Sequence, residues 1–248
     1  MDVLYTVGET SKHDNQELKW SLRSLAKYAK NLGKVIVAGY PPFWLADNVI
    51  RFPIPKLSTD DFKHLHILRQ IILAIKHGIV NGDFLLSSDD HFLTKPTDLE
   101  NILFYKKNDH VPIIYDDIKN NNDKYKISVA ATSELLKKYG YSDVQCCFHK
   151  NTRLNSSVVN EIERLLNLEK NTELSKYGFD PTILFQNIYA KKVPIEFQKS
   201  DDWKIDKFKQ EAIDSGAFSI SDNAFLDKKF LEYMNSEFGK PCIFEKYN

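Results

Sequence analysis

Short apolar runs and amphipathic stretches alternate along the first part of the chain. Each apolar run has the length of a buried strand. The runs lie at 3–7, 34–40, 48–55 and 84–88. One amphipathic stretch covers 15–33, and a second follows 58–61, where Ser, Thr and two Asp residues offer an N-cap and an acidic first turn. This order of elements predicts an α/β fold with an open, mostly parallel sheet and helices on both faces.

Each amphipathic stretch places its aliphatic side chains on one helical face. The first face consists of Leu18, Leu22, Leu25, Ala29 and Leu32, with Gly33 as the expected helix stop. The second consists of Leu65, Leu68, Ile72, Ile75 and Ile79. Lys63 and His66 point away from this second face, so we expect both to be solvated.

The second half of the chain has a less regular pattern. Strands are expected at 111–117, 144–150 and 193–197, and helices at 128–140, 156–168 and 180–192. The helix expected at 180–192 has Asp180 as its cap and Pro181 at its first position. A loop and a further helix follow over 219–239. Since no repeat or low-complexity linker interrupts the pattern, we expect a single domain over 1–248.

Two adjacent carboxylates, Asp89 and Asp90, follow the apolar run "FLLSS". Ligands of open parallel sheets bind beyond the carboxyl ends of the strands. Neighbouring carboxylates repel each other and are costly to desolvate unless a positive charge is bound. Mg²⁺ or Mn²⁺ would supply that charge and leave positions open for phosphate oxygens. The sequence thus favours a metal site of Asp89 and Asp90, with His91 as a possible third ligand, over a solvated turn.

Composition narrows the class of protein. The chain has 248 residues, with 34 basic and 34 acidic side chains and no net charge, which is not typical of nucleic-acid binding. Its three cysteines form no CxxC motif, so a reducing compartment is expected. The first residues do not have the pattern of a signal peptide, and no apolar run could span a bilayer, so we expect a cytoplasmic protein. Abundant Lys, Asn, Ile, Phe and Tyr suggest an AT-rich genome, bacterial or phage.

Four segments resemble a known family. "DVLYTVGE" (2–9), "ELKWSLRSLAKYA" (17–29), "FLLSSDDHFL" (84–93) and "NSEFGKPCIFEKY" (235–247) are similar to motifs of the Stealth sugar-phosphate transferases. The order of elements also resembles the GT-A fold of nucleotide-sugar transferases. The likeness implies a GT-A-like domain in which 1–95 binds the nucleotide sugar, with a UDP-sugar as the expected donor, and 96–248 binds the acceptor.

The resemblance also suggests roles for individual residues. Thr6, Gly8 and Glu9 would contact the base and ribose, Asp89 the metal-bound diphosphate, and Arg23 belongs to the matching helix motif. His149 in "CCFHKN" resembles the active-site histidine of the family in its position. Two departures weaken the case for sugar-phosphate transfer: residues 62–82 contain no acid, and Lys176 lies near the position of a family arginine.

Glycosyl transfer with inversion also requires a base for the acceptor hydroxyl. Asp180 resembles the base of inverting GT-A enzymes, which begins a late helix, although its role as an N-cap is a sufficient explanation. Asp222 and His149 are the other candidates. Arg69, on the flank of its helix, could bind a phosphate or lie on the surface.

The leading hypothesis is a metal-dependent glycosyltransferase that moves a sugar from a nucleotide sugar to a hydroxyl group. The acceptor could be a saccharide or a hydroxymethylated base of phage DNA. Sugar-phosphate transfer to a surface polysaccharide and a non-catalytic nucleotide-sugar-binding module are the alternatives.

Overall fold

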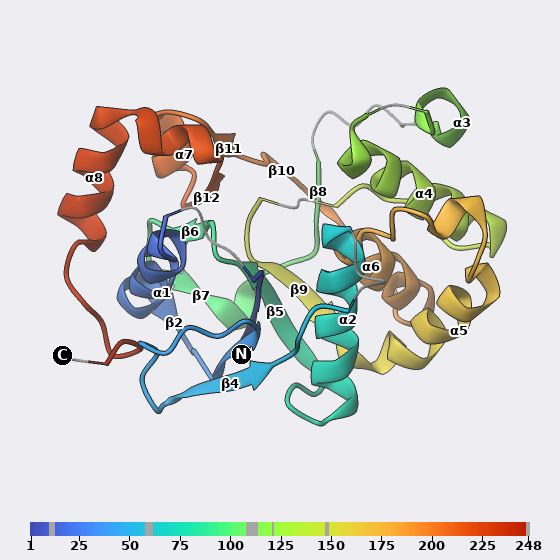
Figure 1. Ribbon diagram of the computed structural model, residues 1–248, viewed down its shortest axis with the longest axis horizontal. Coiled ribbons are helices and arrows are strands. Elements are labelled where there is room, and N and C mark those ends of the chain that lie inside the picture. Colours follow the sequence, from blue (N-terminus) through green and yellow to red (C-terminus); the bar gives the residue numbers. More distant parts are fainter. Residues whose placement is uncertain (10–12, 58–61, 108–113, 121, 147–148, 247–248) are drawn as a thin grey trace.

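A five-stranded sheet forms the centre of the computed structural model, which describes residues 1–9, 13–57, 62–107, 114–120, 122–146 and 149–246 (Figure 1). Its order is β4-β3-β1-β5-β9. The strands are β1 (Asp2–Val7), β3 (Val35–Gly39), β4 (Val49–Pro53), β5 (Asp83–Ser88) and β9 (Thr152–Asn155). The first four are parallel, and β9 pairs antiparallel with β5. This confirms the predicted α/β class and the mostly parallel sheet; β9 was not predicted.

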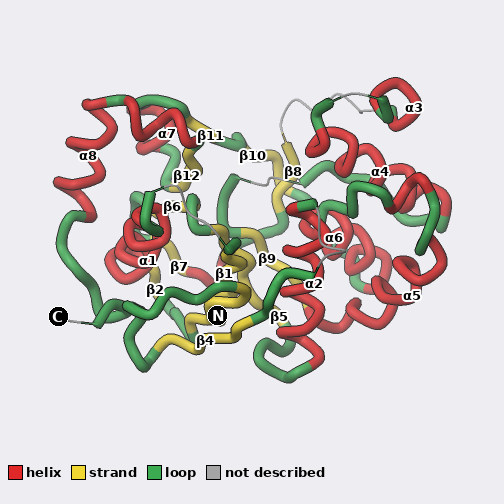
Figure 2. The backbone as a smooth tube through the Cα atoms, viewed as in Figure 1, coloured by secondary structure: helices red, strands yellow, loops and turns green. Residues whose placement is uncertain are grey.

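Helices cover both faces of this sheet, because its central strands alternate their apolar side chains between two cores. Val3, Tyr5 and Val7 of β1 pack with α1 (Gln16–Tyr28), and Leu4 lies in the core of the opposite face. That face is covered by α2 (Lys63–Lys76), α4 (Lys124–Lys138), α5 (Val159–Glu169) and α6 (Pro181–Lys192). Figure 2 shows these four helices gathered on one side of the strands and α1 on the other.

A third core lies beyond α1. Trp20 of α1 packs there with Phe92, Phe218 and Phe230. The surrounding elements are β6 (His91–Leu93), β11 (Lys204–Ile205), β12 (Ala217–Ile220), α7 (Gln210–Asp214) and α8 (Lys228–Phe238). We call this region the C-terminal lobe. Asp89 and Asp90 form the turn between β5 and β6, so the carboxylate pair joins the central sheet to this lobe.

The remaining regular elements are short. Two-residue strands β2 (Ala29–Lys30) and β7 (Thr97–Asp98) pair with each other, as do β8 (Tyr105–Lys107) and β10 (Gln198–Ser200). A short helix, α3, covers Tyr115–Ile118, and 3₁₀ turns cover Leu99–Asn101, Ser156–Val158, Glu173–Ser175 and Asp222–Leu226.

Several predicted boundaries were wrong. The first helix ends at Tyr28 and not at Gly33, because Ala29 and Lys30 leave it to pair with β7. Residues 115–118 form a helix with acidic residues in its first turn, where a strand was expected. The predicted cap at 58–61 and residues 111–113 of that expected strand lie outside the described residues.

Two further expected strands are absent from the described residues. In the described part of the segment 144–150, Cys146 forms an isolated bridge with Lys106. The segment 193–197 has no strand, since Pro194 lacks an N–H donor; pairing begins at Gln198, whose N–H donates to Phe104 O.

The C-terminal segment returns to the N-terminal half of the sheet. Glu245 forms a bridge with Leu45, and Phe244 is buried in the core shared by β1 and α1. The backbone N–H groups of Ala46 and Lys246 donate to Phe244 O and Trp44 O. None of the helices in the described ranges has the length and apolar character needed to cross a membrane.

Candidate functional site

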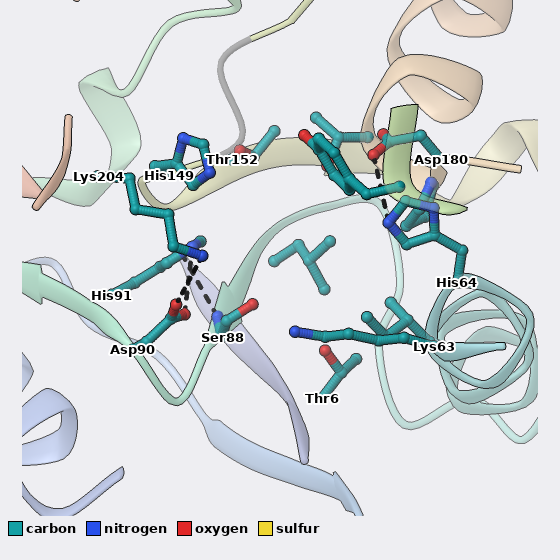
Figure 3. A pocket seen from close by; sticks show the side chains of 15 residues that line it. Thr6, Lys63, His64, Ser88, Asp90, His91, His149, Thr152, Asp180 and Lys204 are labelled. Carbon is teal, nitrogen blue, oxygen red and sulfur yellow. Dashed lines mark hydrogen bonds and ion pairs between the residues drawn. The ribbon is translucent and has the colours of Figure 1, made fainter. Parts of the chain in front are cut away.

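Three adjoining cavities open where β1 and β5 end, and Lys63 lines all of them. The strand-end cavity, of about 390 Å³, is lined by Thr6, Gly8, Glu9, Lys63, Gln70 and Asp89, among others. The carboxylate cavity, of about 540 Å³, includes Glu17, Lys63, Asp89, Asp90, Lys204 and Asp222. The histidine cavity, of about 150 Å³, includes Lys63, His64, Asp90, His91, His149 and Asp180 (Figure 3).

The topology of the sheet explains why the cavities lie here. Numbered along the chain, the four parallel strands have the spatial order 3-2-1-4. The chain therefore leaves β1 towards one edge of the sheet and later returns to the other side of β1 as β5. The crevice outside the carboxyl ends of such a strand pair is the usual ligand site of open α/β sheets. Thr6 and Asp89, from the ends of these two strands, line the same cavity.

Asp89 has an unusual electrostatic environment. Burial, followed by the charge of neighbouring Asp90, raises the pKa of Asp89 to about 7. Asp90 Oδ2 lies 3.9 Å from Lys204 Nζ, and its Oδ1 lies 3.8 Å from His91 Nε2. The turn therefore holds two carboxylates whose joint negative charge is only partly neutralised by protein groups.

His91, the expected third ligand, lies beside Asp90. Its Nδ1 accepts a hydrogen bond from the Ser88 backbone N–H at 3.4 Å, and β6 places the residue opposite Ser219. Burial lowers the pKa of His91 to about 4, so the ring is neutral at neutral pH. Across the described ranges, no group of three or more His, Cys, Asp or Glu side chains is arranged to hold a metal ion. A Mg²⁺ or Mn²⁺ ion held by Asp89 and Asp90 would take its other ligands from phosphate oxygens and water.

Two lysines supply positive charge near the carboxylates. Lys63, the first residue of α2, directs its amine across the cavity towards Thr6 and Ser88 (Figure 3). Lys204 reaches the site from β11. Lys63 points away from the apolar helix face as expected, but periodicity could not show that the solvent on that side fills a cavity. His66, which was also expected to be solvated, is buried and lines the strand-end cavity.

Gln70 closes the floor of the strand-end cavity. Its side-chain amide donates to Val7 O at 3.3 Å and lies against Gly39. Gly39 has φ +97°, and a Cβ there would lie 2.6 Å from Gln70 Nε2. Only glycine therefore allows β3 to end so close to both groups.

The predicted bases lie on two sides of the histidine cavity. Asp180 is the N-cap of α6, where its Oδ1 accepts from Ile183 N–H at 3.0 Å, as the sequence predicted. Its Oδ2 lies 3.9 Å from His64 Nε2. On the Asp90 side, His149 Nδ1 lies 3.0 Å from Asp202 Oδ2, and its backbone N–H donates to Asp202 Oδ1 at 2.8 Å. Asp222 lines the carboxylate cavity instead.

Two predicted binding residues lie elsewhere. The guanidinium of Arg23 forms a bidentate ion pair with the Glu245 carboxylate, with both hydrogen bonds 2.7 Å long. It also donates to Phe238 O at 2.8 Å. Arg23 therefore connects α1 to the C-terminal segment. Arg69 donates to Pro55 O at 2.8 Å and lines a separate, apolar cavity between α2 and α5.

Some cavity residues were not singled out from the sequence. These are His64, Gln70, Tyr125 and Lys204; Asp202, the partner of His149, was not singled out either. Helical spacing placed His64 next to Lys63 but gave no sign that α4 and α6 would enclose it, and no motif surrounds the others. The chain matches no protein-family model and no curated protein. Any function therefore has to follow from the chemistry of the site itself.

Proposed function

We propose that the protein is a nucleotide-sugar-dependent glycosyltransferase. The observation that carries this proposal is the meeting of three cavities at the ends of β1 and β5, around Asp89, Asp90 and Lys63. One cavity has room for a nucleoside, one carries the carboxylates and lysines, and one presents bases to an acceptor.

The donor fits along the first two cavities. The nucleoside would occupy the strand-end cavity, beside Thr6, Gly8 and Glu9. The diphosphate would lie next to the Lys63 amine in the carboxylate cavity, close to the Asp89–Asp90 turn. Asp89 and Asp90 would hold Mg²⁺ or Mn²⁺, which when bound stabilises the negative charge of the leaving diphosphate.

The acceptor hydroxyl would enter the histidine cavity. Its oxygen forms a bond to the anomeric carbon, the bond from that carbon to the diphosphate oxygen breaks, and the nucleoside diphosphate leaves. A base in the cavity takes the hydroxyl proton. Lys204 and His149 lie on the Asp90 side of the cavity, where the Lys204 amine can stabilise the departing diphosphate (Figure 3). The mass of the product separates this reaction from sugar-phosphate transfer, which adds a phosphate to the acceptor.

Thermal unfolding with nucleotides tests the donor site. UDP, GDP and their sugar conjugates are added with and without Mn²⁺. A ligand at about 100 times its Kd stabilises the native state by about 2.7 kcal/mol, so the correct nucleotide raises the Tm by several degrees. We expect Asp90→Asn to lose the Mn²⁺-dependent part of the shift and Lys63→Met to weaken nucleotide binding at least tenfold.

The matched control is Lys76→Met at the other end of α2, where Lys76 pairs with Glu163 outside the three cavities. It should leave the shift unchanged. A wild-type protein that none of the nucleotides stabilises, or an Asp90→Asn variant with the full Mn²⁺-dependent shift, would refute the proposal.

A further inference from the structure

His64 is the second residue of α2 and lies between two polar groups of other helices. Its Nδ1 is hydrogen-bonded to Ser128 Oγ of α4, and its Nε2 faces Asp180 Oδ2 at the start of α6. Tyr125 of α4 lies edge-on to the imidazole ring, with 5.4 Å between ring centroids. The ring is therefore fixed in position from α4, while its Nε2 edge borders the histidine cavity (Figure 3).

The hydrogen bonds determine which nitrogen carries the proton. Ser128 Oγ donates its one proton to Gly178 O at 3.0 Å. It must then accept from His64, so His64 Nδ1 is the protonated nitrogen. In the neutral ring, Nε2 keeps its lone pair and is a proton acceptor.

Nε2 of His64 and the Asp180 carboxylate face each other without a hydrogen bond between them. Both are acceptors, and their separation of 3.9 Å is too long for a hydrogen bond between them. Within the described residues, His64 Nε2 has no hydrogen-bond donor. Burial lowers the pKa of His64, against the opposing effect of Asp180, so the lone pair is present at neutral pH. A hydroxyl group entering the cavity would supply the missing donor.

We propose that His64 is the general base of the transfer reaction and that Asp180 acts beside it without taking the proton itself. The acceptor hydroxyl gives its proton to His64 Nε2 as its oxygen bonds to the anomeric carbon, and the nucleoside diphosphate leaves. The new Nε2–H then points to Asp180, whose charge stabilises the imidazolium. This inference rests on the proposed glycosyl transfer and identifies the base for it.

The layout of the cavity supports this assignment. Asp180 is the N-cap of α6, and a helix N-terminus favours a negative charge at this position. His64 and Asp180 lie across the cavity from Asp90, His149 and Lys204 (Figure 3). An acceptor beside His64 would attack from the side opposite a diphosphate held near Asp90, and displacement with inversion requires this geometry.

The experiment compares wild type with His64→Asn, which can keep the hydrogen bond to Ser128 but has no Nε2. Release of nucleoside diphosphate from a donor, with water as the acceptor, is measured against pH, together with the nucleotide-induced thermal shift. We expect an unchanged thermal shift and a loss of turnover of about 10²- to 10⁴-fold. The fall in wild-type turnover at acidic pH, where His64 becomes protonated, should be absent from the variant.

His77→Asn is the matched control, because His77 is an exposed histidine at the other end of α2. It should keep full turnover. Independently, ¹⁵N NMR of the histidine rings should show the Nδ1–H form of neutral His64, and Ser128→Ala should weaken that preference and shift the pH profile.

The possible failures can be told apart. A wild type that neither binds a nucleotide nor cleaves a donor refutes the proposed function and this inference together, and binding without cleavage refutes the catalytic role of His64. Normal donor cleavage by His64→Asn, within about threefold of wild type, or an Nε2–H form of neutral His64, refutes the inference alone.

Discussion

Asp89 is a carboxyl group whose charge the folded chain stabilises poorly. It lies in a turn beside Asp90, and burial and this neighbour raise its pKa to about 7. A raised carboxyl pKa means that the folded state holds a proton that the unfolded chain releases. The stability of the metal-free protein should therefore fall as the pH rises from about 4 to about 7. A bound cation would reverse this loss of stability, because it stabilises the charged form of the Asp89 carboxylate.

Replacing Asp89 by Asn should stabilise the metal-free protein at pH 7.5, because the amide carries no charge. Three pKa units would correspond to about 4 kcal/mol at 1.36 kcal/mol per unit, but Asp89 is partly exposed, so we expect a gain of about 1–2 kcal/mol. Urea denaturation at pH 5 and pH 7.5, in the presence of a chelator, measures it. The exposed Asp206→Asn should behave as wild type; equal pH dependence in wild type and Asp89→Asn would contradict the expectation.

Some site residues could be predicted because their signals are local. Asp89 and Asp90 directly follow an apolar run, and Asp180 precedes a proline at the start of a helix. Lys204 carries no such signal, since it reaches the cavities only through the folding of the C-terminal lobe. The ion pair of Arg23 could not be predicted because its partner, Glu245, is far away in the sequence.

At the scale of elements, the Arg23–Glu245 pair fastens α1 to the C-terminal segment. Both side chains are nearly buried, at 10% and 7% exposure, and both guanidinium bonds to the carboxylate are 2.7 Å long. Breaking a buried pair by removing one partner leaves the other charge uncompensated, which costs more than the pair contributes.

Arg23→Met should therefore lower the free energy of unfolding by about 3–5 kcal/mol without changing the nucleotide-induced thermal shift. The double variant Arg23→Met, Glu245→Gln should recover part of this loss, since no buried charge is left alone. Urea denaturation gives both values. A loss of nucleotide binding in a folded Arg23→Met protein would contradict this expectation and show that Arg23 takes part in nucleotide binding.

The strands and helices that could be predicted are those whose own residues determine them. The four parallel strands are continuous apolar runs, and α6 has both its cap and its proline. In contrast, β9 has only four residues, and its pairing with β5 is stabilised by contacts of Arg153 and Asn155 with Asp83. β10 likewise depends on β8 as its partner. Short strands of this kind are determined by tertiary pairing and not by local pattern.

At the scale of the molecule, the cavities lie between the central sheet and the C-terminal lobe. The lobe has its own core, made by Trp20, Phe218, Phe230 and others, and it contributes Lys204 and Asp222 to the carboxylate cavity. The sequence predicted one domain and an open sheet but not this packing, because it depends on contacts between distant segments. The site should therefore respond to changes in the lobe that touch no cavity residue.

Phe230→Ala tests this dependence. Removal of a fully buried aromatic ring lowers the free energy of unfolding by about 3–5 kcal/mol. The space left by the Phe230 ring would lie inside the C-terminal lobe. Amide hydrogen exchange should become faster in β6, β11 and β12 and in the Asp89–Asp90 turn, while β1, β3 and β4 keep their protection. Equal acceleration in the central strands would show that the lobe and the sheet unfold as one unit.

The return of the C-terminal segment has a consequence for synthesis on the ribosome. Phe244 belongs to the core in which β1 and α1 are packed, so that core lacks one of its side chains until almost all of the 248 residues have been translated. A nascent chain would expose this apolar surface while the helices on the opposite face of the sheet can already assemble. Chaperone contacts during translation should therefore concentrate on β1 and α1, which are made long before the C-terminal segment that covers them.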